Sequence, residues 1–431
     1  MLFGAISSDG APRPGAPKHR FESAARVCAI AFALAIGLLA TACTSMKMAP
    51  PPPPPMAVGP PPPPPPPPRP LRTDQPGYLR LRNTPAGVVP TRVALLLPMS
   101  SPSAEVRNLA DALERAAELA LFDSGNKTIL LMPRDDGGTS DKAAAAAAKA
   151  INDGAELIIG PLFAQSVTAV APVARAQHVP VVAFSSDRSV GGNGVYLLSF
   201  QPETEVRRII SFAATRGHTS FAALVPRNAY GDIVVDAFRS SVMAAGGSIQ
   251  TVQPFDERAE AVAEPAASVA TSGADAVLIG EGGQLLQSLA PALAVAGMNN
   301  HNVKYLGTGL WDDVSVQRQP MLANGWFAAP PPAAFRDFAA HYRRTYGTNP
   351  PRIATLAYDA ISLTALLSSG KPYDRFTDSA LTDPNGFSGI DGIFRFRDNG
   401  SAERGLAVLQ VGANGFTIVD PAPRQFPAAG F

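Results

Sequence analysis

From Thr91 onward, apolar segments of strand length alternate with amphipathic segments of helix length. Residues 92–98 form a short apolar run, and residues 108–122 follow it with apolar side chains such as Leu109, Leu113 and Ala116 at helical spacing. The unit recurs as strands over 127–132, 156–160 and 180–184 and helices over 140–153 and near 166–177. A repeated strand–helix unit predicts a parallel sheet covered by helices on both faces.

The alternation resumes after a break, with strands over 220–226, 248–254 and 274–280 and helices over 232–245 and 262–272. Near the C-terminus we expect a helix over 353–367 and a hairpin between 392–396 and 405–411 that turns at Asp398, Asn399 and Gly400. The predicted fold class is therefore α/β with two lobes. Each lobe is expected to be a doubly wound, mostly parallel sheet with helices on both faces.

The composition excludes several classes of function. Lys and Arg number 36 against 35 Asp and Glu, so no net field attracts nucleic acid and none is expected as a partner. The only cysteines are Cys28 and Cys43, and the histidines of the body are isolated, so we expect no disulfide and no metal site there. The sequence contains no Gly-x-Ser-x-Gly elbow, phosphate loop or dinucleotide fingerprint. We therefore expect neither an enzyme nor a bound cofactor.

The N-terminal residues 1–42 have the layout of a secretory signal peptide. Basic residues up to Arg26 precede an apolar run over 27–39, and small residues lead to Cys43. The run, about 13 residues long, lies within the ~7–15 of a signal peptide and is shorter than the ~20 that span a bilayer.

The segment 39–43 resembles a bacterial lipobox, which implies cleavage before Cys43 and its lipidation. The membrane is then contacted through the N-terminal lipid. Thr44 follows the cysteine, and by the same resemblance this favours the periplasmic, inner face of the outer membrane over the inner membrane. The alternative is an ordinary cleavage site that contains a cysteine.

A proline-rich linker occupies much of residues 43–90. Residues 50–55 and 60–68 are all proline, which predicts an extended polyproline II spacer. At ~3.1 Å per residue, some 20 residues reach roughly 60 Å. The spacer is expected to carry the body toward peptidoglycan or a partner; the alternative is a passive linker.

Seven short motifs occur in the order and spacing of the type I periplasmic binding protein family, in its leucine/isoleucine/valine-receptor branch. They lie at 93–98, 134–136, 155–161, 179–182, 226–231, 244–247 and 389–411. The resemblance implies that the chain crosses between the lobes near residues 200, 328 and 370. The implied organisation is a signal peptide (1–42), an anchored linker (43–90), a first lobe (91–200 plus 329–370), a second lobe (201–328 plus 371–420) and a tail (421–431).

Candidate ligand-binding residues follow from the predicted sheets, because ligands of open parallel sheets bind beyond the carboxyl ends of the strands. The candidates for a small polar ligand between the lobes are Ser166, Ser185, Ser186, Asp187, Tyr230, Glu281, Trp311 and Asp312. Each has an alternative role. The segment 185–187 can cap the next helix, Tyr230 can pack in its loop, Glu281 and Asp312 can be solvated, and Trp311 can be buried.

The resemblance also shows departures from the amino-acid receptors, which hold the ligand carboxylate with serine or threonine hydroxyls and its ammonium with an acid. Ala164 and Asp187 stand where hydroxyl donors are expected, and Gly309 stands about where the acid belongs. A typical amino-acid clamp is therefore incomplete.

Two functions are consistent with these features. The first is a lipoprotein resembling penicillin-binding protein activators, which pair a lipid anchor and linker with this fold and stimulate a peptidoglycan synthase by contact. The second is a receptor that delivers an amino acid, amide or small peptide to an ABC permease. The incomplete clamp and the tether favour the first.

Overall fold

The computed structural model describes residues 77–426 apart from 84–86, 257 and 373. By its contacts the chain divides into two units, Met1–Pro66 and Pro67–Phe431, and the described residues belong to the second. The expected signal peptide, Cys43 and the proline tracts therefore lie outside the described residues. Among the described residues, no helix is both long and apolar enough to cross a membrane.

The first lobe is built on a five-stranded sheet in which all neighbours are parallel, in the order β2-β1-β3-β4-β5. Its strands are β1 (Thr91–Leu97), β2 (Ile129–Asp135), β3 (Leu157–Ile159), β4 (Val181–Ala183) and β5 (Val195–Leu197). Every residue of β1 is buried, as expected for a strand covered by helices on both faces.

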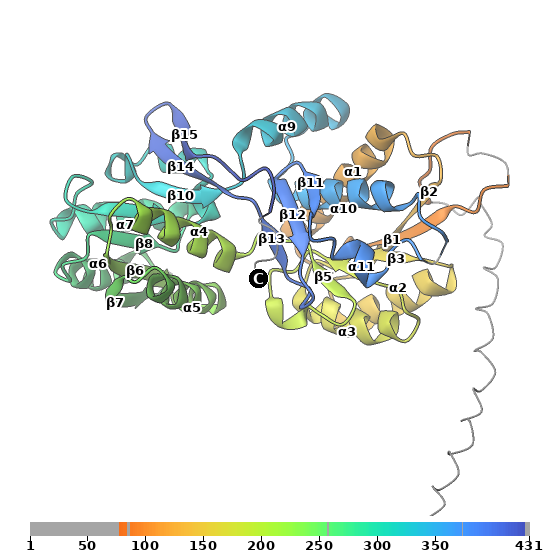
Figure 1. Cartoon of the computed structure of the whole chain (residues 1–431), viewed down its shortest axis with the longest axis horizontal. Coiled ribbons are helices and arrows are strands. Elements are labelled where there is room, and N and C mark those ends of the chain that lie inside the picture. The colour runs from red at the N-terminus through yellow and green to blue at the C-terminus, as the bar shows by residue number, and fades with distance from the viewer. Residues whose placement is uncertain (1–76, 84–86, 257, 373, 427–431) are drawn as a thin grey trace, which may run out of the picture. The chain divides into compact units, whose positions relative to one another are not determined.

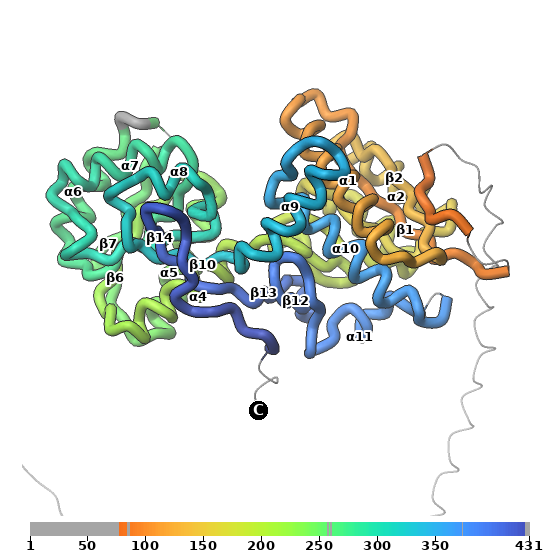
Figure 2. Tube along the Cα trace, turned by 90° about the horizontal axis from the view of Figure 1, so that it is seen from above, coloured from red at the N-terminus to blue at the C-terminus, as the bar shows by residue number. Residues whose placement is uncertain are grey.

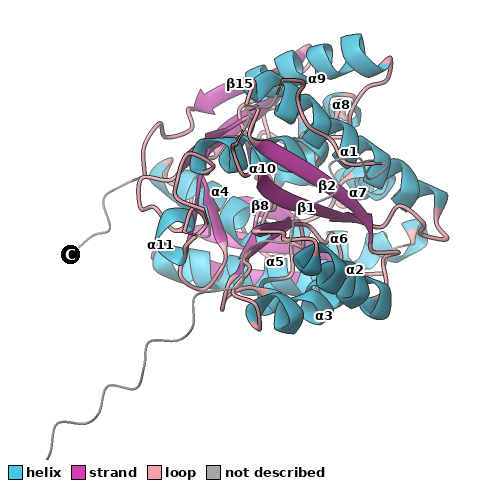
Figure 3. Cartoon of the chain, turned by 90° about the vertical axis from the view of Figure 1, so that its right-hand side faces the viewer, coloured by secondary structure: helices cyan, strands magenta, loops and turns pink. Residues whose placement is uncertain are grey.

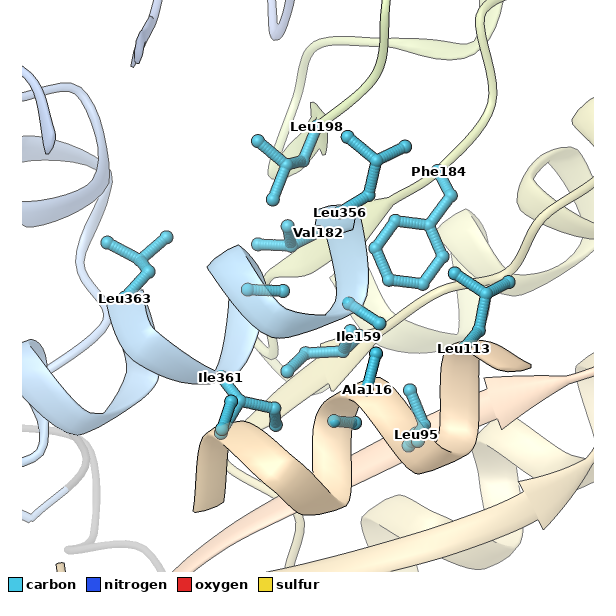
Figure 4. Packing of buried hydrophobic residues seen from close by; sticks show 14 of the residues in the cluster. Leu95, Leu113, Ala116, Ile159, Val182, Phe184, Leu198, Leu356, Ile361 and Leu363 are labelled. Carbon is cyan, nitrogen blue, oxygen red and sulfur yellow. The ribbon is translucent and has the colours of Figure 1, made fainter. Parts of the chain in front are cut away.

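Helices cover both faces of this sheet, as Figure 3 shows. They are α1 (Ala104–Ser124), α2 (Ser140–Asn152), α3 (Ala164–Arg175), α9 (Pro332–Tyr346) and α10 (Ala354–Leu367). Alternate residues of β1 point to opposite faces, so Leu95 packs with α1 and α10 while Leu96 packs with α2 and α3. Figure 4 shows the first of these cores, where Ile159 lies beside Ala116 of α1 and Phe184 lies beside Leu113 of α1.

The N-terminal end of the described body is fixed to the edge of this sheet. Leu79 and Leu131 of β2 exchange two backbone hydrogen bonds of 2.9 Å. The hydroxyl of Tyr78 donates to Asp153 at 3.1 Å, and the guanidinium of Arg134 lies 4.9 Å from its ring centroid. The chain that leads from the linker therefore joins the body on the first lobe.

The second lobe contains a seven-stranded sheet in the order β15-β14-β10-β9-β8-β6-β7. Its strands are β6 (Ser220–Pro226), β7 (Ser248–Phe255), β8 (Ala276–Ile279), β9 (Lys304–Gly307), β10 (Trp326–Ala329), β14 (Ala407–Gly412) and β15 (Gly415–Asp420). The strands from β6 to β10 pair in parallel, and β14 and β15 add antiparallel neighbours at one edge. The predicted α/β class with mostly parallel sheets is confirmed.

Two helix layers cover the second sheet. The pair α4 (Pro202–Thr215) and α5 (Ala229–Ala244) packs on one face, and α6 (Ala263–Ala270) and α7 (Gly283–Val295) pack on the other, with the short α8 (Val314–Gln317) beside α7. Three short 3₁₀ helices complete this lobe, namely η2 (Ala259–Val262), η3 (Gly309–Trp311) and η4 (Pro320–Leu322).

The predicted C-terminal hairpin pairs the wrong strands. Strand β12 (Gly392–Phe396) pairs with β11 (Phe387–Gly389) and β13 (Ala402–Arg404), whereas the segment expected as its partner is β14 of the second lobe. The expected turn at 398–400 is present, but it leads into the shorter β13.

The segment 371–420 also divides between the lobes. Phe376, Phe394 and Phe396 belong to the core formed by α1 and α10, together with Leu381 of α11 (Asp378–Leu381), so the chain remains in the first lobe through β13. The third crossing therefore lies between β13 and β14 and not near residue 370, as Figures 1 and 2 show for the blue C-terminal strands.

Candidate ligand cleft and hinge

The loops after β1 and β2 of the first lobe are held by their own carboxylates. Asp135 accepts backbone hydrogen bonds from Ser100 at 3.0 Å and Gly137 at 2.9 Å. Asp136 is wholly buried, accepts from the amide of Gly138 at 2.7 Å, and burial raises its pKa to about 6. Both acids therefore hold the loops through backbone hydrogen bonds, and burial discourages the charged form only at Asp136.

The candidates after β4 form a capped turn. The hydroxyl of Ser185 accepts from the amide of Asp187 at 3.2 Å. Asp187 in turn accepts from the amide of Ser189 at 2.9 Å and its hydroxyl at 2.6 Å, which caps the 3₁₀ helix η1 (Arg188–Val190). Ser186 is exposed. The capping alternative thus accounts for Asp187, and Ser186 is the one residue of this turn whose hydroxyl is open to a ligand.

Ser166 lies in the first turn of α3 and is wholly buried. Its Oγ atom has no hydrogen-bond partner among the described residues. The side chain therefore lies beneath the loop surface in this structure and does not line an open cleft.

A polar wall stands at the carboxyl edge of the second sheet. The hydroxyl groups of Tyr230 and Thr308 are 2.8 Å apart, and Glu281 accepts from the amide of Gly282 at 2.8 Å. Burial raises the pKa of the Tyr230 phenol, and the charges of Glu205 and Glu281 raise it further. The structure thus brings two predicted residues, Tyr230 and Glu281, to one place.

Glu205 completes this wall and was not predicted from the sequence. It lies in the first turn of α4, is 7% exposed, and accepts from the amide of Gly309 through Oε2 at 2.8 Å. A Cβ at Gly309 would lie 2.6 Å from Oε1 of Glu205. Burial raises the pKa of Glu205 to about 7. A carboxyl group therefore occupies the space beside Gly309, the position where the resemblance in sequence led us to expect an acid on the loop itself.

Trp311 is fully buried in the core of the second lobe, contrary to its prediction as a ligand contact. Its Nε1 donates to the carbonyl of Glu281 at 3.1 Å, and its ring centroid lies 6.3 Å from that of Phe327. The indole therefore supports the loop that carries Glu281 and is not open to a ligand.

Asp312 forms an ion pair between the lobes. Its Oδ2 lies 2.6 Å from Nη1 of Arg352, which comes from the segment before α10 of the first lobe. Nη2 of Arg352 lies 2.8 Å from Asp391, which is wholly buried and also accepts from the hydroxyl of Thr355. Burial raises the pKa of Asp312, and Arg352 opposes this rise. The carboxylate of Asp312 therefore takes part in the contact between the two lobes.

Arg404, a buried arginine, also lies where the lobes join. Nε of Arg404 donates to the carbonyl of Ser199 at 3.2 Å, and its guanidinium lies 5.0 Å from the ring of Phe200. Burial raises the pKa of the neighbouring Asp359 to about 7, and Arg404 opposes this rise. A cavity of about 10 Å³ lies between Arg404 and Glu205, close to the smallest space that holds a water molecule.

The comparison with protein families decides the classification. A family model described as periplasmic binding protein matches residues 90–416. The chain belongs to this family. It is a type I periplasmic binding protein of the leucine-binding-like type, as the sequence motifs implied. This periplasmic binding protein shows no group of His, Cys, Asp or Glu residues that could hold a metal among its described residues.

Curated proteins that match this periplasmic binding protein do so over part of the chain and at low identity. The penicillin-binding protein activator LpoA of Klebsiella pneumoniae is 28% identical over 153 residues, which are 35% of this chain and 20% of that protein. The chain spans less than half the length of the curated relatives that it matches.

Solved structures cover more of the chain. A branched-chain amino acid ABC transporter periplasmic ligand-binding protein from Burkholderia xenovorans LB400 has a TM-score of 0.63 at 17% identity, covering 78% of this chain and 94% of that one. The leucine-binding protein LivK of Thermotoga maritima has a TM-score of 0.55 at 20% identity, covering 78% and 99%. At these identities the similarity shows the fold.

Proposed function

We propose that this chain is a lipid-anchored regulatory protein of the penicillin-binding-protein-activator type, which contacts a peptidoglycan synthase in the periplasm. The observation that carries this proposal is that polar side chains in the first-lobe turn after β4 form hydrogen bonds within the turn itself. Ser185 and Asp187 are hydrogen-bonded within their own turn, so the hydroxyl clamp expected of an amino-acid receptor is reduced to Ser186. The ion pair between Asp312 and Arg352 adds a fixed contact between the lobes.

In this proposal, lipidation at Cys43 anchors the chain to the membrane, and the proline tracts act as the spacer between the anchor and the body. The described body begins on the first lobe at Tyr78 and Leu79, so a tether would hold that lobe and leave the second lobe to meet the partner. We place the anchor in the outer membrane's inner face, in line with the residue that follows Cys43. The partial similarity to a penicillin-binding protein activator supports this choice of partner.

A receptor for an amino acid, amide or small peptide that feeds an ABC permease is the second candidate. The observation that favours it is the polar wall of the second lobe, where Tyr230, Thr308, Glu281 and Glu205 gather at the carboxyl edge of the sheet. Solved structures of solute-binding proteins share the fold. Because a fold hosts several functions, this similarity does not choose between the two candidates.

The test measures both functions on the full-length lipidated chain. The activator proposal expects a rise in the rate of peptidoglycan synthesis when the chain is added to a purified synthase. In parallel, thermal unfolding is followed with amino acids, amides and small peptides, since a ligand at about 100 times its Kd adds roughly 2.7 kcal/mol of stability. A ligand-dependent shift that Tyr230→Phe weakens, together with an unchanged synthase rate, would replace the activator by the receptor.

The tether makes a separate prediction. Replacing residues 50–68 by Gly and Ser at equal length is expected to shorten the mean reach from roughly 60 Å to roughly 25 Å, because a flexible coil is shorter than a polyproline spacer. Stimulation should then fall in cells but persist with purified synthase. Equal stimulation in cells would show that the linker is a passive spacer.

A further inference from the structure

A groove of about 950 Å³ begins beside the predicted turn at Asp187, since Ser189, which donates to Asp187, is part of its lining. Its long walls are α4, with Glu203, Arg207 and Ser211, and one face of α5 between Ile233 and Ala245. The first lobe closes it through η1 and the turn between β12 and β13. Of the eight cleft candidates, none lines this groove.

The length of the walls fits a short extended chain. Glu203 and Ser211 are about two turns apart on α4, and Ile233 of α5 is more than three turns from Ala245, the C-cap of that helix. At ~1.5 Å per helical residue these walls are roughly 12 and 18 Å long, which is the span of about four to five extended residues at ~3.3 Å each. A volume near 950 Å³ is also large for a single free amino acid, since drug-sized ligands fill ~300–1,000 Å³.

The charges of the lining are mixed. Arg207 and Asp236 are both exposed, and within the described part of the chain neither has an ion-pair partner. Arg188 pairs with Glu203 at 3.5 Å across the two lobes.

These groups select one kind of ligand. Glu203 and Asp236 repel phosphates and other anions that carry no cation, and Ile233 is the one large apolar residue of the lining, which is too little for a lipid chain. The floor of α5 is made of small side chains such as Ala237, Ser240 and Ala244, so a backbone can approach it closely.

We propose that this groove binds a short extended peptide that bears both an acidic and a basic group. The acidic group of the peptide meets Arg207, and its basic group meets Asp236. Because residues of both lobes line the groove, its occupation also depends on how the lobes are held. The site goes beyond the function proposed above, and its test needs no synthase.

The experiment titrates the full-length chain with the pentapeptide Lys-Ala-Ala-Ala-Glu, blocked at both ends so that only its side chains are charged. Isothermal titration calorimetry is expected to show binding, and a Gln-Ala-Ala-Ala-Gln peptide should bind roughly tenfold or more weakly, because it loses the charge-assisted contacts. Arg207→Gln and Asp236→Asn should each weaken binding of the charged peptide by roughly threefold without lowering the melting temperature, since both side chains are exposed.

The matched control is Arg239→Gln, an exposed arginine of α5 outside the lining, which should leave the affinity unchanged. Tyr230→Phe is the control for the cleft and should also have no effect. The proposal is overturned if no binding is measured, if the charged and neutral peptides bind equally, if Arg239→Gln weakens binding as much as Arg207→Gln does, or if Tyr230→Phe abolishes binding.

Discussion

Replacing Glu205 by glutamine tests the electrostatics of the second-lobe wall. The carboxyl group is 7% exposed and accepts from the amide of Gly309 at 2.8 Å. Burial raises its pKa from 4.5 to about 7, and the charge of Glu203 adds to this rise. The oxygen of a glutamine amide can accept the same hydrogen bond, so Glu205→Gln removes the titration with little change in shape.

The magnitude follows from linkage. A pKa that rises from 4.5 in the unfolded chain to about 7 in the folded one corresponds to roughly 3 kcal/mol. Because the folded state holds this proton more tightly, the stabilisation is fully present below pH 4.5 and is lost as the pH rises through about 7. The variant does not titrate at this position. Its free energy of unfolding, minus that of the unmodified chain, should therefore rise by roughly 3 kcal/mol across this window.

Urea unfolding at about pH 4 and about pH 8 measures this difference, with the slope of the transition compared to verify that the unfolded states are alike. The matched control is Glu264→Gln, because Glu264 is an exposed glutamate that also lies in the first turn of a helix. A rise of less than roughly 1 kcal/mol for Glu205→Gln, or an equal rise for Glu264→Gln, would refute the burial of a protonated carboxyl group at this position.

Two further variants test the contacts that surround this wall. Gly309→Ala should destabilise the chain by about 1–3 kcal/mol in urea unfolding, because the new Cβ would lie 2.6 Å from Oε1 of Glu205. The destabilisation should be smaller when Glu205 is also replaced by alanine. An equal destabilisation in both backgrounds would contradict the clash. A double-mutant cycle of Asp312→Asn and Arg352→Gln should give a coupling energy of about 1–2 kcal/mol. This is less than for a fully buried pair, because the two side chains are 17% and 23% exposed. A coupling energy below roughly 0.5 kcal/mol would show that this pair does not hold the lobes together.

The strands that the sequence predicts best are those whose whole length is apolar. The expected bounds of β6, Ser220–Pro226, are the observed ones, and each of its residues after Ser220 is apolar. The helix α9, Pro332–Tyr346, was missed because its start lies in a run of prolines, although Phe338 and Tyr342 lie at helical spacing. The C-terminal hairpin was wrong for a related reason: β13 is three residues long, so the apolar run of β14 masked it.

The location of the candidate site was easier to predict than which of its side chains are open to a ligand. Topology alone brings Tyr230 and Glu281 to one edge of the second sheet, because parallel strands present their carboxyl ends together. Sequence cannot tell whether a polar side chain at such an edge faces a ligand or its own backbone. Asp187 is the example, since its carboxylate accepts from Ser189 two residues later.

The relation between Glu205 and Gly309 explains why the missing acid was not found in the sequence. The loop after β9 carries glycine, but the neighbouring volume is filled by a carboxyl group that reaches it from α4, 104 residues earlier in the chain. These two positions meet because the first crossing between the lobes delivers α4 against the end of β9. Glu205 can occupy its position only because residue 309 is glycine, since any larger residue there would displace the carboxyl group. A pattern that spans a lobe crossing of this kind is visible only after the fold is known.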